Sequence, residues 1–294
     1  MKPARLVSGG RAGALDDAAH LEGGLRVQSV HKTFDSAHSG HLVLSDISIE
    51  VPFGQVLALV GPTGCGKSTL LEIVCGLQKP DPGGEVYLGE AKVTGHRGVF
   101  AYMPQRDALL PWKSALNNAV LGLTARGWDK KPSRERALDL FRTFHLAEYA
   151  DYLPRDLSGG MRQRVALLRT FLFPSKYMLL DEPFSALDAI TRSNVHLWLA
   201  EALVEFPRTV LLVTHDIDEA ILLADRVVVL GAHPGRVAAD VMVPISRPRS
   251  LEVGSLPAFQ TVRHELLAAL AKYVPGLLRT STAADNGANS RVAP

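Results

Sequence analysis

The sequence has few of the features that mark membrane-spanning, nucleic-acid-binding or disulfide-stabilised proteins. None of its apolar runs approaches the ~20 residues that a helix needs to cross a bilayer, so we expect any work at a membrane to go through a partner. The formal net charge of the 294 residues is only +2, with no long block of like charge, which argues against a footprint on nucleic acid. The composition, 47% hydrophobic and 21% charged, is that of a globular protein with a sizeable core.

Cysteine and secretory features are equally scarce. The two cysteines, Cys65 and Cys75, lie in a glycine loop and in the segment after it. A disulfide there would distort both segments, so we expect reduced thiols. Residues 1–24 contain no continuous apolar stretch of the kind found in secretory signals. We therefore interpret them as a mobile tail and expect the protein to stay in the cytosol.

The segment from Gly61 to Thr69, here called the phosphate loop, carries the strongest local pattern. It fits the spacing G-x-x-x-x-G-K-[ST], and it lies between two apolar runs. This order predicts a buried strand, a turn whose backbone N–H groups bind phosphate, and the start of a helix. Glycines permit the positive φ angles and the close approach to a ligand that such a turn needs. The alternative is a glycine-rich turn with a solvated lysine, and the flanking elements favour the phosphate loop.

Two residues of the phosphate loop have distinct expected tasks. Lys67 would reach the β- and γ-phosphates, and the hydroxyl of Ser68 would bind magnesium. The residues expected to contact the nucleotide are Gly61, Pro62, Thr63, Gly64, Cys65, Gly66, Lys67, Ser68 and Thr69.

Strand-like and helical periods alternate along much of the chain. The runs 25–32 and 43–51 predict an antiparallel pair of strands before the phosphate loop. Further along, β-branched apolar runs alternate with helical stretches, which predicts a parallel sheet covered on both faces. The later predicted strands are 85–88, 98–103, 177–180, 209–213 and 226–230, and the later predicted helices are 113–121, 134–144, 158–173, 189–205, 217–223 and 256–270.

Two carboxylates end one of the buried runs. Asp181 and Glu182 follow 177–180, so a parallel sheet would present them at the edge where ligands bind. Asp181 suits magnesium because hard cations prefer oxygen ligands, whereas Glu182 could orient or deprotonate an attacking water. The alternative interpretation is a pair of caps for the next helix.

The segment Leu157-Ser158-Gly159-Gly160-Met161, here called the signature segment, is followed by Arg162-Gln163-Arg164. Together they resemble the signature motif of ABC-type ATPases. The other motifs of that family follow in the expected order over about 25–243: Phe34 resembles the aromatic that stacks on adenine, Gln105 the Q-loop glutamine, Asp181 and Glu182 the Walker B acids, Ser185 to Asp188 the D-loop, and His215 the switch histidine.

The resemblance implies an α/β fold of the P-loop NTPase (RecA-like) class. Its parallel-sheet core would carry an N-terminal antiparallel β subdomain and an inserted α-helical subdomain at about 105–160. The ATPase domain would span 25–245, and 246–294 would be a C-terminal extension, disordered after about 280.

The resemblance also implies ATP and Mg²⁺ as cofactors. The metal would be held by Ser68, Gln105 and Asp181, and hydrolysis would depend on Lys67, Gln105, Glu182 and His215. Ser158, Gly159 and Gly160 would face a γ-phosphate bound by a second ATPase subunit, in a head-to-tail dimer that we expect to be a homodimer.

Four of these matches have structural alternatives. Gln105 could be an ordinary polar residue after Pro104, Ser158 a plain helix cap, His215 a satisfied surface histidine, and Phe34 a core aromatic.

The stretch Gln105 to Lys113, with Asn117 and Asn118, resembles the ABC importers of nitrate, sulfonates and taurine, a subfamily that also serves vitamin precursors. Pro104, Asn117 and Met161 depart from common patterns, which leaves the ATPase interpretation intact but blurs the solute. A membrane permease would dock around Arg106 to Trp112. There Leu109, Leu110 and Trp112 form either an exposed apolar patch or part of the core of the helical subdomain.

We therefore expect a peripheral, ATP-hydrolysing subunit at the cytoplasmic face of the cell membrane. It would power import of a small solute together with a permease and a solute-binding protein. The rival function is a non-transport ABC ATPase that acts in remodelling or repair. That function is disfavoured because each motif occurs once and no heptad array separates Lys67 from Asp181.

Overall fold

The computed structural model describes residues 23–35 and 40–273. The tail predicted at the N-terminus lies almost wholly outside the described residues, and the disorder predicted after about residue 280 lies entirely outside them.

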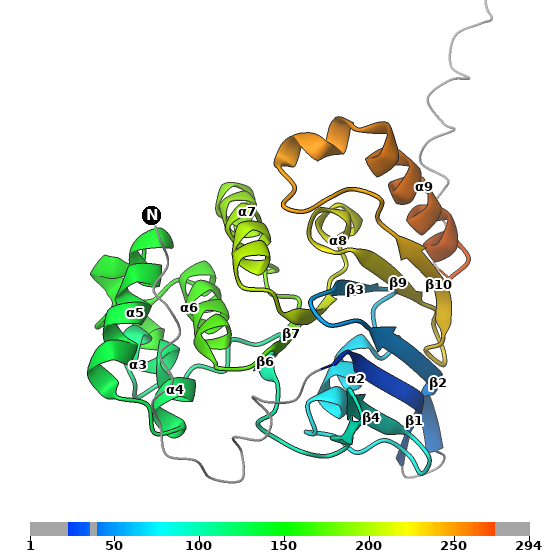
Figure 1. Cartoon of the computed structure of the whole chain (residues 1–294), viewed down its shortest axis with the longest axis horizontal. Helices are drawn as coiled ribbons and strands as arrows, with labels where there is room; N and C mark the ends of the chain where they lie inside the picture. The colour runs from blue at the N-terminus through cyan, green and yellow to red at the C-terminus, as the bar shows by residue number, and fades with distance from the viewer. Residues whose placement is uncertain (1–22, 36–39, 274–294) are drawn as a thin grey trace, which may run out of the picture.

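A four-stranded antiparallel sheet forms one edge of the molecule (Figure 1). The strands β1 (Leu25–Asp35) and β2 (Gly40–Val51) pair in the predicted hairpin, with Leu25 opposite Val51. The short strands β4 (Glu85–Leu88) and β5 (Ala91–Lys92) extend the sheet in the order β2-β1-β4-β5. The predicted antiparallel subdomain is confirmed.

The central sheet has six strands in the order β10-β9-β3-β8-β7-β6. Five of them run parallel: β3 (Val56–Val60), β6 (Ala101–Met103), β7 (Tyr177–Asp181), β8 (Thr209–Val213) and β9 (Arg226–Leu230). Every residue of β3, β7 and β8 is buried, as a parallel sheet covered on both faces requires. The antiparallel edge strand β10 (Val237–Met242) was not among the predicted strands, because Asp240 interrupts its short apolar stretch and most of its residues are exposed.

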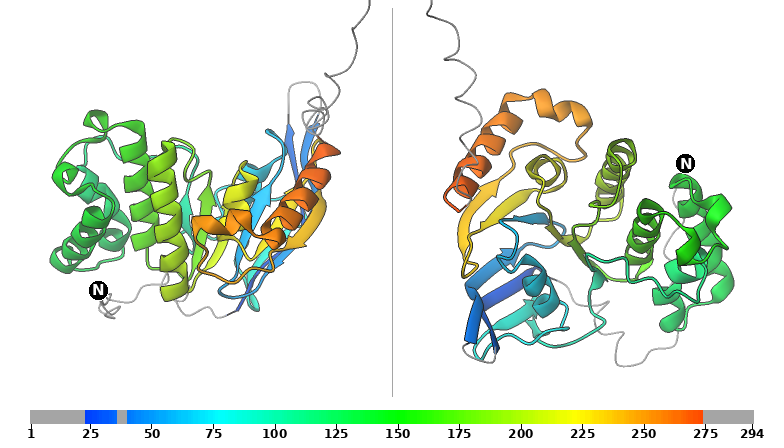
Figure 2. Two further views of the ribbon diagram at one scale, coloured as in Figure 1. Left: turned by 90° about the horizontal axis from the view of Figure 1, so that it is seen from above. Right: turned by 180° about the vertical axis from the view of Figure 1, so that it is seen from behind.

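The helices divide between a helical lobe and the covers of the sheet (Figures 1 and 2). Their bounds are α2 (Lys67–Val74), α3 (Ala115–Ala119), α4 (Leu121–Ala125), α5 (Lys130–Thr143), α6 (Gly159–Leu172), α7 (Ala189–Glu205), α8 (Ile217–Leu223) and α9 (Pro257–Ala271), with short 3₁₀ turns η1 (Ala147–Tyr149), η2 (Pro154–Asp156) and η3 (Leu251–Ser255).

The helical lobe, α3 to α6, contains the main errors in predicted helix bounds. The single helix predicted over 113–121 is divided at Val120 into α3 and α4. The helix α5 begins at Lys130 rather than at residue 134, and it contains Pro132. Proline is accepted there because the first turn of a helix leaves its N–H groups unpaired in any case.

Strand β3 separates two hydrophobic cores. Val56, Ala58 and Val60 belong to the core beneath the helical lobe and α7 to α9, whereas Leu57 and Leu59 face α2 and the antiparallel sheet. This alternation places the end of β3, and the phosphate loop after it, between the two halves of the molecule.

The residues after β10 pack onto the sheet rather than away from it. Arg249 is buried and donates hydrogen bonds to the carbonyl oxygens of Ile221, Ala224 and Ile245, and burial lowers the pKa of its guanidinium to about 10. Helix α9 covers α8 and β10. Among the described residues, no helix combines the length and apolar character needed to cross a bilayer.

Candidate active site

The phosphate loop joins the end of β3 to α2, as predicted. Gly64 and Gly66 adopt left-handed backbone angles, with φ of 81° and 98°. A Cβ at Gly66 would also lie 2.5 Å from the side chain of Leu44. Glycine is therefore required at Gly66 both by conformation and by space.

The ammonium group of Lys67 lies within the loop itself. Its Nζ donates to the carbonyl oxygens of Gly61 at 2.8 Å and Pro62 at 2.9 Å, and the side chain is only 7% exposed. Phosphate oxygens could replace these two acceptors. Cys65, whose thiol pKa is raised by burial, and Cys75 are both free, as predicted.

The loop between β9 and β10 supports the phosphate loop from outside, which the sequence did not reveal. The N–H of Gly235 donates to the carbonyl of Val43 at 2.8 Å, and the N–H of Ser45 donates to the carbonyl of Gly235 at 2.9 Å. A Cβ at Gly235 would overlap the carbonyl oxygen of Cys65. This close backbone approach links β2, the phosphate loop and the β9–β10 loop.

Asp181 lies at the end of β7 beside Ser68. Its side chain accepts a hydrogen bond from Ser68, and burial raises the pKa of its carboxyl group despite that bond. The residue is 2% exposed, and its Oδ1 has no hydrogen-bond partner among the described residues. A buried carboxylate oxygen without a partner, next to a hydroxyl, is a donor set that suits a divalent cation.

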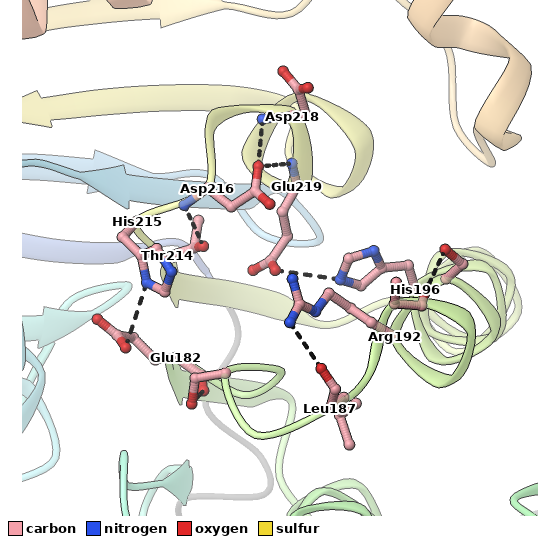
Figure 3. A network of polar contacts seen from close by, with 12 residues as sticks. Glu182, Leu187, Arg192, His196, Thr214, His215, Asp216, Asp218 and Glu219 are labelled. Atoms are coloured by element: carbon pink, nitrogen blue, oxygen red, sulfur yellow. Dashed lines mark hydrogen bonds and ion pairs between the residues drawn. The ribbon is translucent and has the colours of Figure 1, made fainter. Parts of the chain in front are cut away.

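The structure brings together three of the four predicted catalytic residues. The Oε2 of Glu182 accepts from Gln105 Nε2 at 3.3 Å and lies 3.5 Å from His215 Nδ1, as Figure 3 shows for the histidine. Glu182 has a φ of 47°, a strained conformation of the kind found at functional sites. Lys67 lies at the start of α2, on the other side of strand β8 in the sheet order.

The alternative interpretation of Asp181 and Glu182 as helix caps is wrong. The cap of α7 is Asp188, whose side chain accepts from the N–H of Thr191 at 3.0 Å. That hydrogen bond lowers the pKa of Asp188. The two acids thus remain available for other partners.

The signature segment starts α6 in the helical lobe. Ser158 caps the helix through a hydrogen bond from the N–H of Met161 at 3.2 Å, as its position predicted. Gly160 lies against the D-loop of the same chain, since a Cβ there would be 3.3 Å from the carbonyl oxygen of Ala186. The task of Ser158, Gly159 and Gly160 toward a second subunit stays a prediction.

Gln163 is a residue of the site to which the sequence assigned no task. Its Nε2 donates to the carbonyl of Glu182 at 3.1 Å and to Ser185 Oγ at 3.3 Å, and its Oε1 accepts from the N–H of Ala186 at 2.6 Å. The available signal was a polar side chain on the buried face of α6. The side-chain amide of Gln163 thus holds α6 against the turn that carries Glu182.

Phe34 lies on β1, 37% exposed, with Lys32 Nζ 5.0 Å from its ring centre. This exposure contradicts the alternative of a core aromatic. The task of Phe34 as the adenine platform stays a prediction.

The patch expected at 109–112 is divided between both interpretations. Leu109 is buried in the core, whereas Trp112 is 73% exposed. The backbone of this loop is held by Arg169, which donates to the carbonyls of Asp107 and Ala108 at 2.8 and 2.7 Å. A large exposed aromatic on a fixed loop is typical of a partner surface.

Comparisons with known proteins identify relatives of this chain. A family model described as ABC transporter matches residues 44–185. The aliphatic sulfonates import ATP-binding protein SsuB 1 of Mesorhizobium japonicum is 46% identical over 215 residues, which are 71% of this chain and 76% of that protein. The taurine import ATP-binding protein TauB of Pseudomonas aeruginosa is 38% identical over 76% of this chain and 84% of its own length.

A solved structure has the same arrangement of elements. The dimeric, post-hydrolysis structure of the ATP-binding cassette MJ0796, bound to ADP and Pi, superposes with a TM-score of 0.69 and is 28% identical. The match covers 76% of this chain and all of that one.

Proposed function

This chain belongs to the family of ABC transporter ATP-binding proteins and is an ATPase of that kind, and on that premise we propose that it powers the import of a small sulfonate. The 46% identity to an aliphatic sulfonates import protein carries the proposal, and the 38% identity to a taurine import protein supports it. Nitrate and vitamin precursors form the wider solute class suggested by the stretch 105–113.

Hydrolysis would proceed by in-line attack of water on the γ-phosphate of ATP. Glu182 would accept the proton of the attacking water, while Gln105 and His215, which contact its carboxylate, would hold it in place. Lys67 would leave the carbonyls of Gly61 and Pro62 and bind the β- and γ-phosphates instead. Positioning and charge stabilisation account for most of the catalysis of such reactions.

A magnesium ion would bind to Ser68, Asp181 and Gln105. The buried, unpartnered Oδ1 of Asp181 and the neighbouring hydroxyl of Ser68 support this site. The ion would neutralise charge on the β- and γ-phosphate oxygens.

A second ATPase subunit, identical in our proposal, would complete each site. Its signature segment would face the γ-phosphate bound by the first subunit, with Ser158 supplying a hydroxyl and the start of α6 supplying N–H groups. The dimeric state of the MJ0796 cassette supports this assembly. ATP would join the subunits, and hydrolysis would release them.

The permease would dock at Arg106 to Trp112, where Trp112 is exposed. The protein would thus be peripheral, at the cytoplasmic face of the cell membrane. A solute-binding protein would deliver the solute to the permease on the other side.

The test is an ATPase assay with the chain alone and with its permease in liposomes. We expect taurine or an alkanesulfonate, presented with its binding protein, to stimulate hydrolysis in the liposomes. Stimulation by DNA instead, with no response to any permease, would favour the rival repair function. Unchanged binding of the permease by the Trp112→Ala variant would contradict docking at this surface.

A further inference from the structure

A buried ionisable pair joins α7 to α8 close to the site and has no task in the proposed mechanism. His196 Nε2 lies 3.2 Å from Glu219 Oε2, within ion-pair distance but not aligned for a hydrogen bond, and the two side chains are only 8% and 6% exposed. Buried pairs of this kind contribute little net stability, because desolvation offsets their attraction. The role of the pair therefore follows from the elements that His196 and Glu219 contact.

On one side, His196 holds the turn that carries Glu182. Its ring packs edge-to-face against the ring of Phe184, with centres 4.5 Å apart and planes at 86°. Phe184 is fully buried and follows Glu182 after one proline. The position of Glu182 at the end of β7 thus depends on the packing between α7 and this turn.

On the other side, Glu219 holds the start of α8, directly after His215. Its backbone N–H donates to Asp216 Oδ1 at 3.2 Å, and the N–H of Asp216 donates to Thr214 Oγ1 at 3.0 Å. Figure 3 shows this chain of contacts, which runs from Glu219 through Asp216 to Thr214, the residue before His215. Glu219 thereby contacts α7 through its side chain and the loop that carries the switch histidine through its backbone N–H.

The two branches meet at a small cavity of about 30 Å³, which is large enough to hold water. Glu182 and His215 line one part of its wall, and Glu219 and Arg192 line another. Arg192 itself donates to the carbonyl of Leu187, in the D-loop, at 2.8 Å. Glu219 thus lines the same small cavity as Glu182, and His196 reaches the turn of Glu182 through Phe184.

We propose that His196 and Glu219 are positioning residues of the ATPase reaction, which hold Glu182 and His215 at their contact distance of 3.5 Å. The inference rests on the proposed function of Glu182 and His215 in hydrolysis. Both residues lie on α7 and α8, outside the phosphate loop, so we expect nucleotide binding through Lys67 to be independent of them.

The test compares kcat and KM for ATP in His196→Ala and in the conservative His196→Gln. We expect kcat of the alanine variant to fall by roughly 10- to 100-fold, because small misplacements of reacting groups have effects of this size. KM is expected to stay within about twofold of wild type, since the phosphate loop is untouched. His196→Gln keeps a polar N–H group that can face Glu219, so it is expected to restore most of kcat.

A second cavity makes chemical rescue possible. It measures about 410 Å³, lies between α7, α8, η3 and α9, and is lined in part by His196 and Glu219. The space vacated in His196→Ala would join it, so added imidazole is expected to raise kcat several-fold. The matched control is His264→Ala, which removes an exposed histidine on α9 outside this lining and is expected to leave kcat unchanged with or without imidazole.

Phe184→Leu provides a second test in case His196→Ala does not fold. Leucine keeps an apolar side chain of similar volume in the core, but it removes the ring that packs against His196. The variant is therefore expected to lower kcat by a few-fold at constant KM. A folded His196→Ala with the kcat of wild type, or a fall that neither glutamine nor imidazole reverses, would overturn the positioning task. A wild-type chain without ATPase activity would instead overturn the function on which it rests.

Discussion

The phosphate loop and the signature segment both place glycines at the start of a helix, but the chain constrains them differently. Gly64 and Gly66 are left-handed, and a side chain at Gly66 would strike Leu44. Gly159 and Gly160 have ordinary helical backbone, and the nearest described atom to a Cβ at Gly159 is 3.9 Å away. The glycines of the phosphate loop are required by this chain's own fold. In the signature segment, Gly160 lies close to the carbonyl of Ala186 in the same chain, whereas Gly159 has no close neighbour among the described residues and, in our proposal, serves a ligand held on a second subunit.

The largest expected effect follows from joining the two segments across a dimer. Glu182→Gln removes the proposed proton acceptor but keeps both segments, so kcat should fall by at least about 100-fold. The variant should accumulate as a dimer with ATP bound, which light scattering with and without ATP would detect. Turnover equal to that of wild type in the assembled transporter would remove Glu182 from this task.

The next prediction compares how a substitution in each segment changes the affinity of the chain for ATP. Lys67→Ala loses a charged donor to phosphate and should weaken ATP binding by about 100-fold, measured by titration at high dilution. Ser158→Ala, the matched change at the other helix start, should leave that affinity unchanged and reduce hydrolysis only in concentrated protein. An equal loss of ATP affinity in both variants would contradict the different tasks proposed for the two segments.

A smaller effect tests the glycines themselves through thermal unfolding. Gly66→Ala should destabilise the chain by about 1–2 kcal/mol, because it forces a side chain into left-handed backbone. Gly159→Ala should change stability by no more than about 0.5 kcal/mol. It should nevertheless lower the ATPase rate of the dimer. A large loss of stability in Gly159→Ala would show that the fold of the single chain itself requires glycine at this position.

The last prediction concerns a modest effect on stability at Asp181, beside the phosphate loop. Asp181→Asn should stabilise the metal-free chain by about 1 kcal/mol at pH 7, because it removes a buried carboxylate, while abolishing hydrolysis. Burial raises the pKa of Asp181, so the native wild type binds this proton more tightly than the unfolded chain does. The free energy of unfolding of the wild type should therefore rise relative to that of the variant as the pH falls through that raised pKa. Denaturant unfolding at pH 7 and pH 4.5 would measure the change.

Prediction from the sequence succeeded where a pattern was long and local. The buried strands β7, β8 and β9 and the helices α7 and α8 lie where apolar periodicity placed them. It failed at β10, whose outer residues are exposed at the sheet edge, and at the start of α5, where proline is accepted in the first turn. In both places, tertiary position decides what the local pattern leaves open.

The sequence by itself determined the phosphate loop, because glycine conformation, the lysine and the helix start all act within consecutive residues. It also indicated the family, through motifs whose order and spacing are read directly. Only the tertiary structure decided that Gln105 and His215 meet at Glu182, and that Gln163, Gly235 and the pair of His196 and Glu219 support the site. These contacts join residues far apart in the chain, so they follow from packing between elements rather than from any local rule.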